Sequence, residues 1–132
     1  MRIYLTHCSA KKDNKLKNSK IQVTPDKLYK STKLLGFVKK CKDANASWAI
    51  FSDKYGIWFP TERHEWYERD PNSVTEIEFK ELLENFQKKL DCFDEIFFYY
   101  NPGRFHPLYE RLLKEAKVKA RITKFTQKAV IV

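Results

Sequence analysis

Three short apolar runs in this chain each give way to a polar turn that carries reactive or flexible residues. The runs span residues 3–6, 48–51 and 96–100, and the last is apolar along its whole length, as expected for a strand covered on both faces. Gly56 and Gly103 close the turns after the second and third runs. If these strands are parallel, all three turns lie at one edge of the sheet, where open α/β sheets bind their ligands.

Amphipathic stretches separate the runs, with apolar residues about 3.6 positions apart as in helices. Thr24-Pro25 predicts the start of the first helix, and the spacing of Ser73 and Glu76 predicts a capping box at the second. The pattern predicts one α/β domain over residues 1–132, in βαβαβαβ order with a mainly parallel sheet of four or five strands. The expected strands lie at about 2–8, 47–53, 95–100 and 120–126. Long loops are expected at about 10–24 and 55–72. The first of these loops is either a lid or disordered.

The net charge of +9 is distributed unevenly along the chain. Residues 1–42 carry a balance of +10, residues 43–95 a balance of −7 and residues 96–132 a balance of +6. This layout predicts a surface with one basic face, suited to phosphate or nucleic acid. Lysine-rich helices that are merely solvated would give the same totals, so this alternative stays open.

Cysteine usage and missing motifs narrow the class of protein. The cysteines Cys8, Cys41 and Cys92 follow no CxxC spacing, so we expect them to be reduced. We expect no leader and no membrane-spanning segment, and therefore a cytoplasmic protein without membrane contact. The chain contains no GxGxxG, GxxxxGK(S/T), GxSxG or HExxH motif. We therefore predict no cofactor and no metal.

The first candidate site follows the first apolar run. Cys8 lies next to Ser9 and close to Lys11, at backbone amides that the strand end leaves free. A thiol near lysines can lose its proton and attack as a thiolate. Alternatively, Cys8 is a small buried residue while Ser9, Lys11 and the amides contact an anion such as phosphate. A purely structural role for this turn is the third interpretation.

The turns after the other two runs also carry polar side chains. Ser52, Lys54 and Tyr55 precede Gly56, which allows the backbone to approach a ligand closely. This set can hold a polar planar ligand, or its side chains can simply satisfy the turn. Asn101 can read a base edge through its amide donor and acceptor. Five aromatic residues alternate with Arg and His in the 55–72 loop and form a candidate base-stacking surface: Tyr55, Trp58, Phe59, Trp66 and Tyr67. We expect at least two of these five side chains to be buried.

Several short blocks occur in the same order as in a known family. They comprise Cys-Ser-Ala-Lys-Lys, Leu-Tyr, Ser-Asp-Lys-Tyr-Gly, a proline and a tyrosine, at 8–12, 28–29, 52–56, 60 and 67. Over residues 3–67 the chain resembles a small domain-of-unknown-function family found in archaea, bacteria and phages. Its members carry a Cys-Ser-x-x-Lys start and a Ser-Ala-Lys-Tyr-Gly-Leu-x-x-Pro block, from which Asp53 and Ile57 depart. More distantly, the first block is similar to that of the uracil-DNA-glycosylase-like domain of archaeosine synthase.

This resemblance implies a three-layer sandwich of the uracil-DNA-glycosylase-like type, and a flavodoxin-like sheet is the alternative architecture. It also implies a base or nucleotide pocket at the strand ends. By carry-over from the matching blocks, eight residues would line that pocket: Cys8, Ser9, Lys11, Tyr29, Ser52, Lys54, Tyr55 and Gly56.

We therefore predict a domain that binds a nucleobase, a nucleotide or nucleic acid at the carboxyl edge of the sheet. One version of this hypothesis is an enzyme that modifies the base, with Cys8 and Ser52 as the reactive groups. In it, Lys11 and Lys54 hold phosphate or carboxylate groups, Tyr29 and Tyr55 position or stack the ring, and Asn101 reads the base edge. Two alternatives remain: a non-catalytic module that binds nucleic acid through its basic ends and aromatic loop, and an assembly module that forms a homo-oligomer through apolar residues 130–132.

Overall fold

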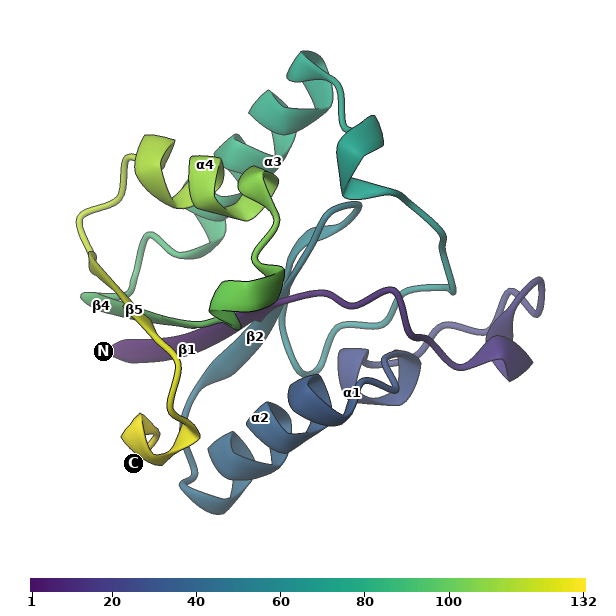
Figure 1. Cartoon of the computed structure of the whole chain (residues 1–132), viewed down its shortest axis with the longest axis horizontal. Helices are drawn as coiled ribbons and strands as arrows, with labels where there is room; N and C mark the ends of the chain where they lie inside the picture. Colours follow the sequence, from purple (N-terminus) through teal and green to yellow (C-terminus); the bar gives the residue numbers. More distant parts are fainter.

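A five-stranded sheet runs through the middle of the protein in the order β3-β2-β1-β4-β5, as Figure 1 shows for the computed structural model of residues 1–132. The four strands β1, β2, β4 and β5 are parallel to one another, and β3 alone runs antiparallel, beside β2. The strands are β1 (Arg2–His7), β2 (Trp48–Ser52), β3 (Gly56–Trp58), β4 (Glu95–Tyr99) and β5 (Arg121–Phe125). The predicted α/β class and mainly parallel sheet are confirmed.

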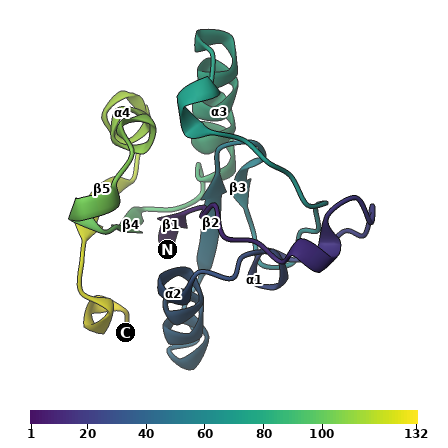
Figure 2. The same cartoon turned by 45° about the vertical axis from the view of Figure 1, so that its right-hand side comes forward.

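Helices cover both faces of the sheet, as Figure 2 shows. One face carries α1 (Pro25–Leu28) and α2 (Thr32–Asp43), and the other carries α3 (Glu76–Lys89) and α4 (Pro107–Glu115). Four short 3-10 helices lie in the connections: η1 (Asn14–Leu16), η2 (Pro71–Ser73), η3 (Pro102–Arg104) and η4 (Lys128–Val130). None of the helices is both long and apolar enough to cross a bilayer.

The central strands are buried because helices cover them on both sides. All five residues of β2 are buried, as are Ile3 to Thr6 of β1. By contrast, in β5, one of the two edge strands, only Phe125 is buried. This difference agrees with the sequence, in which the residue 121–125 segment is much more polar than the other runs.

The helix boundaries differ from the sequence prediction at two places. The helix expected to run from Pro25 breaks after Leu28, and α2 starts anew with Ser31 as N-cap, whose hydroxyl accepts a hydrogen bond from the Leu34 N–H. The capping box lies at Thr75 and Glu78, two residues after the predicted pair. Both pairs have the spacing of a capping box, so the sequence alone does not decide which of them begins the helix.

Three segments predicted as loops or loose ends are held by tertiary contacts. The expected loop at 55–72 contains β3, and the 10–24 segment is anchored by isolated bridges from Lys12 to Tyr29 and from Val23 to His64. At the carboxyl end, Ile131 is buried in the protein's own core, while Val130 and Val132 are exposed. The side chain at the centre of the proposed oligomer contact is therefore used within the chain.

Candidate functional site

The strand order places a switch point between β1 and β4. From β1 the chain leads through α2 to β2 on one side, and from β2 it crosses through α3 to β4 on the other side of β1. In open α/β sheets, ligands bind beyond the carboxyl ends of the strands at such a point. A pocket of about 460 Å³ lies there, formed by the ends of β1 and β4, the 101–104 turn and the start of α2. Figure 1 shows the turn and the start of α2 on either side of the end of β1.

The first turn of α2 supplies free backbone donors to this pocket. The hydroxyl of Ser31 accepts only the N–H of Leu34, so the N–H groups of Thr32 and Lys33 have no hydrogen-bond partner in the protein. Thr32 and Lys33 line the pocket. Free N–H groups at the positive end of a helix favour an anion at this position.

The side chains of the pocket add positive charge without any negative charge. Lys11, Lys33 and Arg104 line it, all three are exposed, and none of them belongs to any of the ten ion pairs of the protein. The lining contains no aspartate or glutamate; its remaining members are Thr6, His7, Cys8, Ser9, Ala10, Ser31, Thr32, Leu34, Tyr99, Tyr100 and Asn101. The pocket is therefore suited to an anionic ligand.

His7 is a pocket residue that the sequence analysis did not select. Its Nδ1 lies 2.8 Å from the carbonyl oxygen of Cys8, and because a carbonyl only accepts, Nδ1 carries the proton. Nε2 then holds the lone pair and makes no hydrogen bond in the protein. Burial lowers the pKa of the His7 imidazole below its ordinary value, so the ring is neutral at pH 7. The signal in the sequence was a titratable residue at the end of an apolar run.

Cys8 lies at the edge of this pocket, but its thiol is tied into a buried cluster. Its Sγ is 3.1 Å from the Tyr109 hydroxyl and 3.5 Å from Oδ1 of Asp53, and it accepts the Asp53 N–H at 3.4 Å. Burial, and secondarily the charge of Asp53, raises the pKa of the Cys8 thiol to about 11. The thiol is therefore protonated at neutral pH, which does not favour the thiolate interpretation.

Ser52 and Tyr29 are fully buried and belong to a chain of hydroxyl groups. The Ser52 hydroxyl donates to the Tyr67 oxygen at 3.1 Å, and the hydroxyls of Tyr67 and Tyr29 are 2.5 Å apart. Ser52 Oγ also accepts the N–H groups of Lys54 and Tyr55. The geometry gives no support for Ser52 as a reactive group or for Tyr29 as a ring-binding group, because neither reaches open space.

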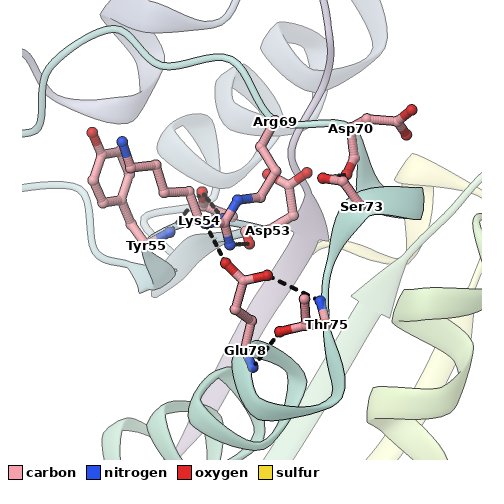
Figure 3. Close-up of polar contacts among 9 residues, drawn as sticks. Asp53, Lys54, Tyr55, Arg69, Asp70, Ser73, Thr75 and Glu78 are labelled. Carbon is pink, nitrogen blue, oxygen red and sulfur yellow. Dashed lines mark hydrogen bonds and ion pairs between the residues drawn. The ribbon is translucent and has the colours of Figure 1, made fainter.

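Lys54 and Tyr55 lie in a different, smaller pocket of about 220 Å³, with Arg69 and Glu78. Figure 3 shows how Arg69 joins this region: it donates to the Asp53 carbonyl at 3.0 Å and pairs with Glu78 at 2.9 Å. Glu78 is also the capping-box residue of α3, bonded to Thr75. These contacts fasten the turn to α3.

Gly56 serves the backbone rather than a ligand. It has φ +74°, and a Cβ added there would lie 2.2 Å from Oδ1 of Asn85, which accepts the Ile57 N–H. The aromatic loop is also largely structural: Trp58 and Tyr67 are buried, as expected for at least two of its members, and Tyr55 stacks on His64 at 4.0 Å.

The single cavity expected around all the predicted residues is thus divided. The structure brings Cys8, Ser9, Lys11 and Asn101 together at the switch point. Oδ1 of Asn101 accepts the Gly103 N–H at 3.2 Å, and its amide NH₂ group is free for a ligand. The other predicted residues lie in the buried chain or beside the second pocket: Tyr29, Ser52, Lys54, Tyr55 and Gly56. No three His, Cys, Asp or Glu side chains meet in a way that could hold a metal ion.

The structure alone defines the class of this protein: an α/β domain with a mostly parallel five-stranded sheet and a basic pocket at its switch point. Comparisons with known proteins add no function, since no protein-family model, no curated protein and no solved structure matches the chain.

Proposed function

We propose that the protein binds a nucleotide, with its phosphate at the first turn of α2 and its base toward Tyr100 and Asn101. The observation that carries this proposal is the meeting of Lys11, Lys33 and Arg104 with the free N–H groups of α2 in one pocket that contains no carboxylate. Such a set matches a phosphate in both charge and hydrogen bonding, because phosphate oxygens only accept. The free amide of Asn101 offers donors to the acceptors of a base edge.

The size and the position of the pocket support the same ligand class. Its volume of about 460 Å³ falls within the range typical of small-molecule sites. Counting the parallel strands alone in chain order, the sheet reads 2-1-3-4, which matches a flavodoxin-like sheet and its ligand site between the first and third strands. We propose a flavodoxin-like or uracil-DNA-glycosylase-like architecture on this basis, and kinship with the family of the Cys-Ser-x-x-Lys block on the sequence.

In the version of the proposal in which the protein modifies its ligand, His7 is the group that accepts a proton. It is neutral, its Nε2 is free, and it lines the pocket. The Cys8 carbonyl supports this role by accepting a hydrogen bond from Nδ1–H, which fixes the tautomer. The buried cluster around Asp53 then serves to position the end of β1.

Isothermal titration calorimetry with nucleoside monophosphates and the corresponding nucleosides tests the proposal. We expect the phosphate to increase the affinity at least tenfold, and Lys11→Ala with Arg104→Ala to remove that gain, since each charged contact contributes roughly 1.5–3 kcal/mol. Lys80→Ala, on the exposed face of α3, is the matched control. Equal affinity for nucleotide and nucleoside, or equal loss in the control, would contradict the proposal.

A further inference from the structure

Four segments of the chain hold most of its positive charge and none of its negative charge. Residues 1–12, 27–42, 96–109 and 116–132 contain 15 of the 26 Lys and Arg residues and none of the 17 Asp and Glu residues. They supply β1, α2 without its last residue Asp43, β4 without its first residue Glu95, the turn after β4, and β5 with η4. These elements surround the switch-point pocket or lie next to it, so the positive charge continues beyond the pocket.

One row of this charge runs along α2. Lys33, Gly36 and Lys40 are three and four positions apart, which places them on one face of the helix. The Nζ of Lys128 lies 2.7 Å from where a Cβ on Gly36 would be, so η4 packs on that face; both views show η4 beside α2 (Figures 1 and 2). The missing side chain at Gly36 lets the Lys128 ammonium lie between the two helix lysines.

A second group of cations lies on the β4–β5 side of the pocket. Lys124 of β5 has its Nζ 5.4 Å from the ring centre of Tyr100, which itself lines the pocket. Arg104 follows in the turn after β4. None of Lys40, Lys124 and Lys128 takes part in an ion pair, and all three are exposed. We call the pocket cations together with Lys40 and Lys128 the basic band, whereas Lys124 lies on the side of the pocket formed by Tyr100 and Phe105.

The acidic residues nearest to α2 do not neutralise the band. Asp26 pairs with Lys42 and Asp43 with Lys39, and these lysines are not members of the band. On the opposite side of the sheet, α3 carries the glutamates that balance Arg69 and Arg111. The band is therefore a row of free cations that begins at the pocket and follows α2.

We propose that the ligand of the pocket is the phosphorylated end of a single-stranded nucleic acid, whose backbone continues along the basic band. This inference rests on the proposed function of the pocket and extends it. From Lys33 to Lys40 the helix rises about 10 Å, so cations at both ends of this row can contact successive parts of one strand's backbone. A pocket of about 460 Å³ holds one nucleotide and has no room for a paired base, which selects a single strand over a duplex.

Fluorescence anisotropy with labelled decamers tests this inference on the full chain. The probes are DNA and RNA strands with a 5′-phosphate, a 3′-phosphate or hydroxyl ends, and a DNA duplex. We expect the phosphorylated single strand to bind at least tenfold more tightly than a mononucleotide and than the duplex. The sugar that binds more tightly assigns the strand as DNA or RNA, and the better end gives its direction.

Two variants separate the band from the pocket. Lys40→Ala with Lys128→Ala should weaken decamer binding at least fivefold and reduce the slope of log affinity against log salt by about 1.4, at about 0.7 per phosphate contact. The same variant should bind the mononucleotide within twofold of the wild type. The matched control is Lys80→Ala with Lys88→Ala on α3, which should leave both affinities within twofold.

The possible results distinguish the two proposals. If the mononucleotide binds but the decamer binds no better, or if the band variant behaves like the control, the band inference is overturned while the pocket stands. If decamer binding depends on Lys40 and Lys128 but not on the end phosphate, the strand does not start in the pocket and the inference is wrong. If neither probe binds, both proposals fail.

Discussion

Removal of the Tyr67 hydroxyl tests the buried chain that joins β2 to the 10–31 segment. The oxygen of Tyr67 accepts a hydrogen bond from Ser52 and is 2.5 Å from the hydroxyl of Tyr29. Tyr67→Phe keeps the ring, and therefore its packing, but leaves the hydroxyl proton of Ser52 and the hydroxyl of Tyr29 without this partner. Both residues are fully buried, so water cannot replace it.

The expected cost follows from these two groups. A buried hydroxyl without a partner costs about 1–3 kcal/mol, so for two such groups we expect Tyr67→Phe to lower the free energy of unfolding by about 2–6 kcal/mol. This is a large part of the roughly 5–15 kcal/mol that stabilises a domain of this kind. Urea denaturation followed by tryptophan fluorescence measures the change, and the dependence on urea should keep its slope.

A double-mutant cycle identifies the cause. Tyr29→Phe removes one of the two groups that Tyr67→Phe would orphan, so the double variant should be more stable than the sum of the single effects by about 1 kcal/mol. Tyr100→Phe removes a hydroxyl that makes no hydrogen bond in the protein and should change stability by less than about 0.5 kcal/mol. A Tyr67→Phe cost below about 0.5 kcal/mol, or strictly additive effects, would refute the reasoning.

Two further predictions concern substitutions at the glycines and at the buried carboxylate beside Cys8. Gly56→Ala should lower the free energy of unfolding by about 2–4 kcal/mol in urea denaturation, because the positive φ disfavours alanine and the Cβ displaces Asn85. Gly36→Ala should instead raise it by up to about 1 kcal/mol, because only the flexible end of a lysine must move. Equal effects of the two substitutions would contradict this. Asp53→Asn removes a charge that helps raise the pKa of Cys8 to about 11, so iodoacetamide should alkylate Cys8 about threefold or more faster at pH 9, and an unchanged pH profile would count against that coupling.

The strands could be predicted from the sequence because a strand buried on both faces consists of a continuous run of apolar residues. Apolar runs at 48–51 and 96–100 have no other stable environment in a chain of this length, and β2 and β4 form there. The meeting of Cys8, Lys11 and Asn101 followed from the same pattern, since parallel strands end at one edge.

Strand order could not be read from the runs, and it decides which turns meet. Because β1 and β4 are neighbours, the turns after them share a pocket, while the turn after β2 reverses into β3 and faces α3 instead. That pairing depends on Ser52 opposite Gly56 and on Asn85, contacts that only the folded chain contains. Likewise, the helix breaks after Leu28, so that α2 begins at the pocket, and the Lys30 N–H there donates a hydrogen bond to the Lys11 carbonyl. This contact between distant residues could not be predicted from the sequence.

The most direct test of the phosphate site follows the backbone amides of α2 by NMR. Adding a nucleoside monophosphate to the ¹⁵N-labelled protein should shift the amide signals of Thr32 and Lys33 most, because their N–H groups gain an acceptor that they now lack. The signals of Ser9 to Lys11 should follow, and the corresponding nucleoside should leave all of them unchanged. Shifts confined to the Lys54 and Tyr55 region, or equal shifts with the nucleoside, would contradict an anion site at the start of this helix.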